Sequence, residues 1–184
     1  RDELSKLMMS DMPDRGFEIL RELELLPFVM QELLEGYGVG QNKHHVYTVW
    51  EHNLRALKHA AEKKWPLEVR LAALFHDIGK PRSRRPGDKK AYTFYGHEVI
   101  GARMTARALE RLKFPKDMAD KITKLVRYHM FYYLPDQVTE SSVRRLVANI
   151  GRENVEDLLK VREADRIGSG TPKAIPYKLR HLKF

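Results

Sequence analysis

The sequence has 184 residues, enough for one domain with a buried core, and its 42% hydrophobic and 32% charged residues are typical of a globular protein. It contains no cysteine, which excludes disulfide bonds and thiolate metal sites, and no apolar run approaches the ~20 residues that span a bilayer. The net charge of +9 fits either a polyanionic partner such as nucleic acid or an ordinary solvated surface.

The first residues, Arg1 to Leu4, lack the basic-then-apolar pattern of a signal peptide. Together with the absence of cysteine, this favours a cytoplasmic location and no membrane partner. The chain begins without Met, within a pattern typical of a helix, and we therefore expect it to be part of a longer protein.

Apolar residues recur at three- and four-residue intervals along most of the chain, which is the pattern of amphipathic helices. Pro13 and Pro27 suit the first turns of two short helices, and a glycine-rich loop follows at 36–40. We expect further helices at about 45–63, 66–79, 96–112, 115–130, 139–150 and 152–167.

Two segments depart from the helical pattern. Residues 81–91 contain two prolines, a glycine and several basic residues, and they are predicted to form an exposed basic loop. The run from Ala91 to Tyr95 could form a strand, but it has no obvious partner. With no other strand pattern and no repeat, the expected fold class is all-α, a compact multi-helix bundle.

Several polar residues lie on the apolar faces of the expected helices. His52 follows Val49 by three residues, and Asp165 follows Val161 by four, so each points toward the core. The full set is His52, His76, Asp77, His97, His129 and Asp165.

One inward histidine is commonly a hydrogen-bonded core residue, but an unpaired buried carboxylate is costly. Two carboxylates and four histidines on separate helices therefore favour a shared divalent cation over a metal-free polar network. Nitrogen and oxygen ligands suit Mn, Fe, Co, Ni or Zn, and Mg less naturally.

The pair His76-Asp77 ends the apolar run LAALFHDIGK, just before Gly79. Adjacent side chains on a helix point about 100° apart, so one could bind a metal ion while the other reaches a second ion or a water. The dipeptide alone occurs by chance in many proteins. Its combination with His52 before it and the distant Asp165 after it is far more specific.

In order and context, these residues resemble the motif of the HD superfamily of metal-dependent phosphohydrolases. Nearly the whole chain is also similar to the C-terminal half of bacterial tRNA nucleotidyltransferases, which include CCA-adding enzymes and related poly(A) polymerases. The similar segments are RDELSKLMMSDMPDRGFEILRELELL, GVGQNKHHVYTVWEHNLRAL, RLAALFHDIGKP, YGHEVIGA and EADRIGSG.

The resemblance implies a division of the chain into three parts. Residues 1–40 would be a helical linker like the neck of tRNA nucleotidyltransferases, 41–170 the HD domain, and 171–184 a basic tail. A nucleotidyltransferase head would precede Arg1 in the full-length protein, so this segment by itself is not expected to add nucleotides.

The resemblance also implies roles for individual residues. His52, His76, Asp77 and Asp165 would bind one metal ion, and His97 and His129 would help to bind a second. The implied activities are phosphatase and 2',3'-cyclic phosphodiesterase. Cyclic dinucleotides are not expected as substrates, because Lys80-Pro81 stands after Gly79 where a GYP signature would be needed.

We expect metal-assisted hydrolysis of a nucleotide or RNA phosphoester, with tRNA as a fitting partner and with one or two Mn, Ni, Co, Fe or Mg ions as cofactor. His76 and Asp77 would lie at the reaction centre, and Asp77 would bridge two ions if two are bound. Lys80 could contact the substrate phosphate. The basic residues that could bind an RNA backbone, or could simply be solvated, are Arg82, Arg84, Arg85, Lys89 and Lys90.

Three smaller groups of residues have alternative interpretations. His44 and His45 lie near His52 and could reach the site, although they fall at a helix start. Trp50, Tyr132 and Tyr133 could stack on bases, but packing is the safer interpretation. Arg144 and Arg145 are interpreted as plain surface residues.

A function of a different class stays open: an RNA-binding body of a nucleotidyltransferase whose metal site is structural or inactive. The complete set of candidate ligands favours the enzyme, whereas the charge of +9 favours binding, and both can hold together.

Overall fold

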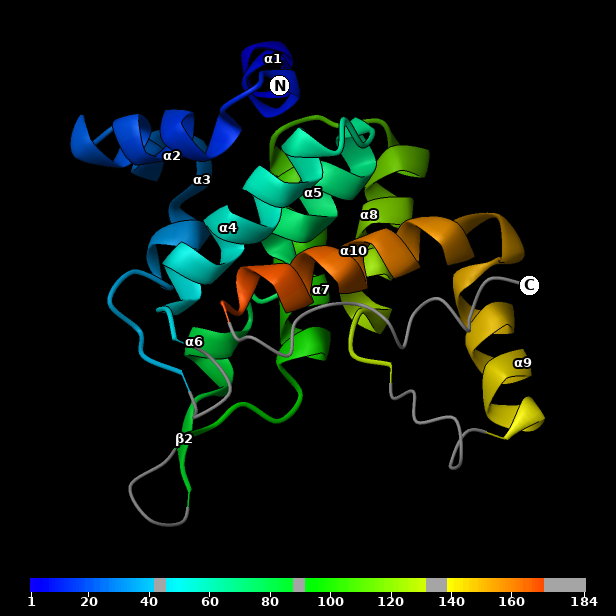
Figure 1. Ribbon diagram of the computed structural model, residues 1–184. Coiled ribbons are helices and arrows are strands. Elements are labelled where there is room, and N and C mark those ends of the chain that lie inside the picture. Colours follow the sequence, from blue (N-terminus) through cyan, green and yellow to red (C-terminus); the bar gives the residue numbers. More distant parts are fainter. Residues whose placement is uncertain (42–45, 88–91, 132–138, 171–184) are drawn as a thin grey trace.

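Helices make up most of the computed structural model, which describes residues 1–41, 46–87, 92–131 and 139–170 (Figure 1). The expected all-α class is confirmed, with a single two-stranded hairpin in the described residues. The helices are α1 (Asp2–Met9), α2 (Pro13–Glu22), α3 (Leu26–Leu34), α4 (Val49–Glu62), α5 (Leu67–Phe75), α6 (Lys80–Ser83), α7 (His97–Arg111), α8 (Lys116–Tyr128), α9 (Glu140–Ile150), the 3₁₀ turn η2 (Arg152–Asn154) and α10 (Val155–Gly168).

The N-terminal helices α1 to α3 pack against the end of the bundle (Figure 1). As predicted, Pro13 begins α2 and Pro27 lies in the first turn of α3. Phe17 is fully buried in the same core as residues of α4, α5 and α8. The Trp50 indole N–H donates to Glu18 Oε1 at 2.7 Å, so a polar contact also ties α2 to α4.

The start of α4 is set by a capping box. Thr48 Oγ1 accepts from the Glu51 backbone N–H at 3.3 Å, and the Glu51 carboxylate accepts from the Thr48 N–H at 2.8 Å. These two bonds satisfy backbone donors that a helix N-terminus leaves free. The helix therefore begins at Val49, whereas the apolar pattern predicted a start at about residue 45.

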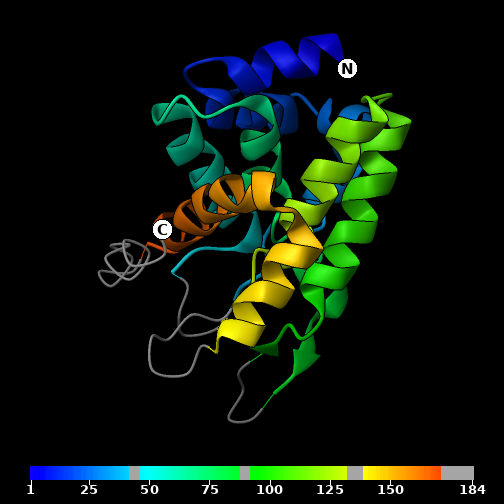
Figure 2. The same ribbon diagram turned by 90° about the vertical axis from the view of Figure 1, so that its right-hand side faces the viewer.

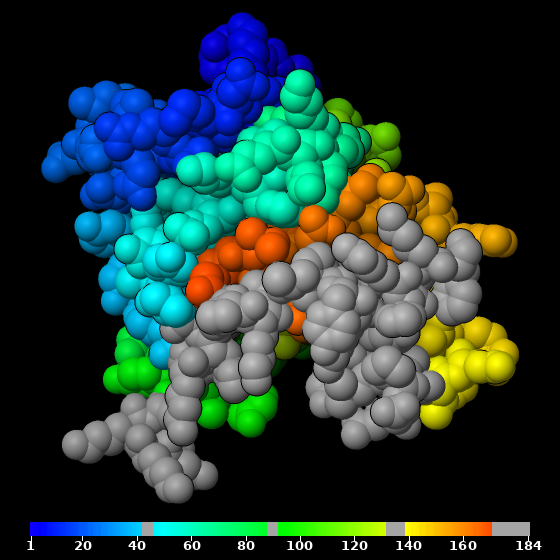
Figure 3. All heavy atoms as spheres, in the orientation of Figure 1, coloured from blue at the N-terminus to red at the C-terminus, as the bar shows by residue number. Residues whose placement is uncertain are grey.

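Helices α4, α5, α7, α8 and α10 form the central bundle. Figure 2 shows α7 and α8 side by side, and α10 packs along α4 and α5, where Figure 3 shows it next to them on one face of the molecule. No helix in the described ranges is long and apolar enough to cross a membrane.

The end of α5 and the segment after it differ from the sequence expectation. Helix α5 ends at Phe75 rather than near Gly79, because a turn follows in which Ile78 N bonds to Phe75 O at 3.0 Å. The short helix α6 stands where an exposed loop was predicted to begin, and its Ser83 is buried.

The strand-like run does have a partner. Strand β2 (Tyr92–Thr93) pairs antiparallel with β1 (Arg85–Pro86), so the expectation of no partner is wrong. The Arg84 guanidinium lies 3.5 Å from the centre of the Tyr92 ring, a cation–π contact that helps to hold this hairpin. Lys89 and Lys90 lie outside the described residues, as does the expected tail at 171–184.

Candidate metal centre

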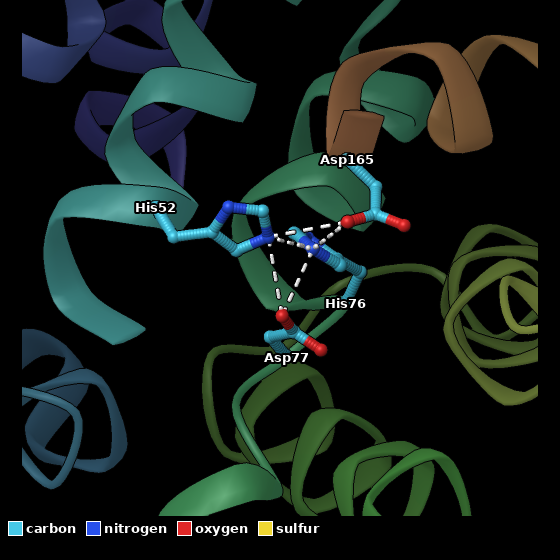
Figure 4. A group of neighbouring side chains, drawn as sticks. All are labelled: His52, His76, Asp77 and Asp165. Carbon is cyan, nitrogen blue, oxygen red and sulfur yellow. Dashed lines mark hydrogen bonds and ion pairs between the residues drawn. The ribbon is translucent and has the colours of Figure 1, made fainter. Parts of the chain in front are cut away.

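Four buried side chains from three parts of the fold meet at one point, as Figure 4 shows. His52 comes from α4, His76 and Asp77 from the turn directly after α5, and Asp165 from α10. The Nε2 atoms of His52 and His76 are 2.8 Å apart. Asp77 Oδ2 lies 3.1 and 3.3 Å from these two nitrogens, and Asp165 Oδ1 lies 3.3 and 3.5 Å from them.

A second group shares Asp77 with the first. Its other oxygen, Oδ1, lies 3.2 Å from His97 Nε2 and 3.7 Å from His129 Nε2. His97 is the first residue of α7 and His129 directly follows α8. The structure thus brings together all six residues that the sequence singled out, in two groups with one carboxylate in common.

Two close helix approaches make this convergence possible. At Gly168, an added Cβ would lie 3.0 Å from His52 O and 3.2 Å from Ala56 N, so the bare backbone lets α10 pack against α4. At Gly79, an added Cβ would clash with the backbone of α7 at His97 and Gly101. Side chains at these two positions would push Asp165 and His97 away from the centre.

The histidine rings are held in a fixed orientation. In His76, His97 and His129, Nδ1 bonds to the backbone carbonyl three residues earlier, so Nδ1 carries the proton and Nε2 faces the centre. The acceptors are Ala73, Phe94 and Val126, at 2.7, 2.8 and 2.7 Å. Such backbone contacts commonly orient metal-binding histidines.

The residues present fit a divalent cation. The Nε2 atoms of His97 and His129 are buried and make no hydrogen bond, although both lie near Asp77 Oδ1. A buried nitrogen lone pair without a donor is costly, and a cation between nitrogen and carboxylate would satisfy it. The cluster of buried His and Asp side chains is therefore compatible with a divalent metal site.

The electrostatics of the cluster point the same way. Burial opposes charge on Asp77, but Lys80 and His76 outweigh it and hold the pKa of Asp77 well below its usual range. Burial also opposes charge on Asp165, and hydrogen bonds from His52 and His76 keep the pKa of that carboxyl well below normal. Both carboxylates are thus anionic and suited to binding a cation.

His76 and His129 differ in their protonation state. Burial lowers the pKa of His76, but the neighbouring Asp77 and Asp165 carboxylates dominate and raise it to about 10. Burial lowers the pKa of His129 to about 4. Without metal, His76 is the cation that balances the carboxylates, and His129 is neutral with a free nitrogen lone pair.

Lys80 faces this centre rather than solvent. Its side chain is 8% exposed, and Nζ forms an ion pair with Asp77 Oδ2. The same ammonium donates to Gln41 Oε1 at 2.6 Å, and the Gln41 amide donates to Tyr47 O at 3.1 Å. Sequence reasoning missed Gln41, because it stands in a glycine-rich loop without periodicity.

Arg162 is a second contact that the sequence analysis overlooked. Its guanidinium donates to Asp165 Oδ2 at 2.6 Å, which leaves Oδ1 directed at the two histidines. The spacing of three residues on one helix could have predicted this pair.

The arginines assigned to RNA binding have different surroundings. Arg82 makes a bidentate pair with Glu35, at 2.8 and 2.6 Å, and Arg84 covers Tyr92, so both already have partners within the protein. Arg85, in β1, is exposed. Their contact with RNA stays a prediction.

The minor candidates differ in their exposure and contacts. Trp50 is 2% exposed and packed, as interpreted, so its ring is not available to stack on bases. Arg144 pairs with Glu140 on the surface, and Arg145 is also exposed, as interpreted, and lines a groove. His44, His45, Tyr132 and Tyr133 lie outside the described residues.

The protein is a helical bundle in which buried His and Asp side chains from several helices meet. It therefore falls in a class of helical proteins suited to bind divalent metal ions. Residues 49–168 match the family model of the HD domain, and the chain belongs to the HD domain family. Residues 1–36 match a second model, described as a probable RNA- and SrmB-binding site of polymerase A.

Curated relatives are tRNA nucleotidyltransferases and CCA proteins. The chain is 34% identical to the CC-adding tRNA nucleotidyltransferase of Thermus thermophilus, over 92% of this chain and 39% of the relative. It is 36% identical to the A-adding tRNA nucleotidyltransferase of Deinococcus radiodurans, over 95% and 40%. The multifunctional CCA protein of Verminephrobacter eiseniae is 32% identical, over 79% and 35%. The chain thus spans about two-fifths of the length of the first two relatives.

Proposed function

We propose that this HD domain is a metal-dependent phosphohydrolase that acts on phosphoesters of nucleotides or RNA ends, such as 2',3'-cyclic phosphates. The observation that supports it best is the convergence of six buried candidate ligands in two groups that share Asp77. A site with a purely structural metal needs no such shared carboxylate, whereas phosphoester hydrolysis commonly uses a bridged pair of ions.

His52, His76, Asp77 and Asp165 would hold one ion, and Asp77, His97 and His129 a second. When bound, a divalent cation lowers the pKa of water toward ~7 and polarises a phosphoryl oxygen. The mixed nitrogen and oxygen ligands favour Mn, Fe, Co or Ni over Mg.

The remaining chemistry comes from side chains of the domain. The Lys80 ammonium, held between Asp77 and Gln41, would attract the phosphate of the substrate and balance charge that develops on it. Arg162 would keep Asp165 in place, and the backbone contacts of His76, His97 and His129 would keep the Nε2 atoms of these residues directed at the centre.

RNA is the proposed source of the phosphoester. The relatives are named for tRNA nucleotidyl transfer, the matched N-terminal model is described as RNA-binding, and the net charge is +9. A polyanionic end group would therefore be attracted to the protein before it reaches the centre. We infer that the substrate is the end of a tRNA or a similar RNA, and that the chain forms part of a tRNA nucleotidyltransferase or poly(A) polymerase-like protein.

The test is hydrolysis of p-nitrophenyl phosphate, bis-p-nitrophenyl phosphate and 2',3'-cyclic AMP by metal-stripped protein, with Mn, Ni, Co or Mg added in turn. We expect turnover that depends on added metal and falls in Asp165→Asn by more than the roughly 100-fold that loss of an outer-shell partner costs. Asp157→Asn is the matched control, since Asp157 is a buried carboxylate on the same helix with lysine partners. Turnover that survives Asp165→Asn, or that Asp157→Asn abolishes equally, would contradict the proposal.

A second candidate is an RNA-binding body with a structural metal, and the match of residues 1–36 to an RNA-binding model favours it. In that case RNA affinity would depend on salt but not on metal. Metal-loaded protein that binds tRNA and hydrolyses none of the panel would support this candidate over the enzyme.

A further inference from the structure

A groove opens between the end of α8 and helix α9, outside the cluster described above. Its volume is about 470 Å³, within the range of roughly 300–1,000 Å³ that small-molecule sites occupy. Arg127, Tyr128 and Phe131 line it from the α8 side, and Ser142, Arg145 and Asn149 line it from α9.

The groove borders the candidate metal centre at two places. Glu98 lines the groove directly after His97, and its carboxylate lies 3.8 Å from His97 Nδ1 and 3.6 Å from the Arg127 guanidinium. A molecule bound in the groove therefore lies next to the start of α7, where the candidate metal ligand His97 is located.

The second place is Met130, which lines the groove directly after His129. Its sulfur lies 3.5 Å from the Arg162 guanidinium, which in turn donates to Asp165 at 2.6 Å. Contacts from both groups of candidate ligands thus lead to the same groove.

The lining suits one nucleotide. Tyr128 and Phe131 are aromatic and partly exposed, and aromatic rings bind unpaired bases by stacking. The Asn149 amide and the Ser142 hydroxyl each offer donors and acceptors for a base edge or a ribose hydroxyl. Arg127 and Arg145, one on each wall, offer guanidinium groups that can stack on the base or donate to its edge.

We propose that this groove binds the terminal nucleotide of an RNA and that its phosphate then lies toward the candidate metal centre. The proposal deepens the proposed function by naming where the base of the substrate binds. The binding itself needs no hydrolysis. A free nucleotide shares the same chemistry, and the experiment separates the two.

The test compares Arg145→Ala with Arg144→Ala. Both remove an arginine from α9, but Arg144 pairs with Glu140 on the surface and does not line the groove. We expect Arg145→Ala to raise KM for 2',3'-cyclic AMP about tenfold, the usual effect of losing one charge-assisted hydrogen bond. Hydrolysis of bis-p-nitrophenyl phosphate, which has no base, should change less than twofold, and Arg144→Ala should leave both substrates unchanged. Equal effects of Arg145→Ala on both substrates, or no effect on either, would overturn the proposal.

Binding is measured separately, so that it does not depend on turnover. Fluorescent N-methylanthraniloyl AMP is titrated into wild-type, Arg145→Ala and Arg144→Ala protein and displaced with AMP or with a trinucleotide ending in adenosine. We expect about tenfold weaker binding in Arg145→Ala alone, and displacement by the trinucleotide at roughly tenfold lower concentration than by AMP. Normal nucleotide binding by a protein without turnover would contradict the proposed function but support the groove as a nucleotide-binding site. Equal displacement by the two competitors would overturn the RNA end as its ligand.

Discussion

Metal uptake at the candidate centre should release a proton. The carboxylates of Asp77 and Asp165 raise the pKa of His76 to about 10, against the opposing effect of burial. In metal-free protein at pH 7, His76 therefore holds a proton on the nitrogen that faces the centre. A metal ion binds only the neutral imidazole, so binding must displace that proton.

The size of the effect follows from the pKa values. Between pH 6 and 8, the affinity for the ion that binds His76 should rise about tenfold for each pH unit, or roughly 100-fold in total, because this ion displaces one proton. His129, with a pKa of about 4, is already neutral at pH 6 and adds no proton of its own.

The same shift has a consequence for the stability of metal-free protein. The folded pKa of His76 lies above its ordinary value of 6.5. The stabilisation from its ion pairs is therefore fully present below pH 6.5 and is lost as the pH rises through about 10.

Titration calorimetry with Mn or Co in two buffers of different ionisation enthalpy measures both the affinity and the number of protons released. In Asp165→Asn, one carboxylate that raises the pKa of His76 is gone, so both the affinity and its pH slope should fall. Asp157→Asn should behave as the wild type. An affinity that does not change between pH 6 and 8, with no proton released, would refute the assignment of His76 as a ligand that is protonated without metal.

Two further predictions concern how α10 is held. Gly168→Ala should destabilise the protein by roughly 1 kcal/mol in urea unfolding, because crowding of the new Cβ against the His52 carbonyl exceeds the ~1 kcal/mol gain in helix propensity; a more stable variant would contradict this. Asp157→Asn removes ion pairs to Lys121 and Lys160 and should cost about 0.5–1 kcal/mol at pH 7. Although burial opposes its charge, the lysines lower the pKa of Asp157. Its contribution to stability is therefore present above pH 3.8 and is lost as the pH falls further. Thermal unfolding at pH 7 and pH 3 should show that the difference in stability between variant and wild type becomes smaller in acid.

The fold class and the inward position of the unusual polar residues could be predicted from the sequence alone. Apolar spacing reports which face of a helix is buried, so His52 and Asp165 were placed on inward faces, and both are buried. Helix boundaries were predicted less well. The start of α4 depends on side-chain capping by Thr48 and Glu51, which competes with the apolar pattern.

Which distant side chains meet depends on how the helices pack in three dimensions. Gln41 reaches Lys80 from a loop without periodicity, and Arg145 faces a groove while its neighbour Arg144 points to solvent. Local spacing cannot predict such contacts, because they depend on how closely and at what angle separate helices pack. That packing is in turn permitted by single glycines such as Gly79 and Gly168, whose importance appears only when the neighbouring backbone is in place.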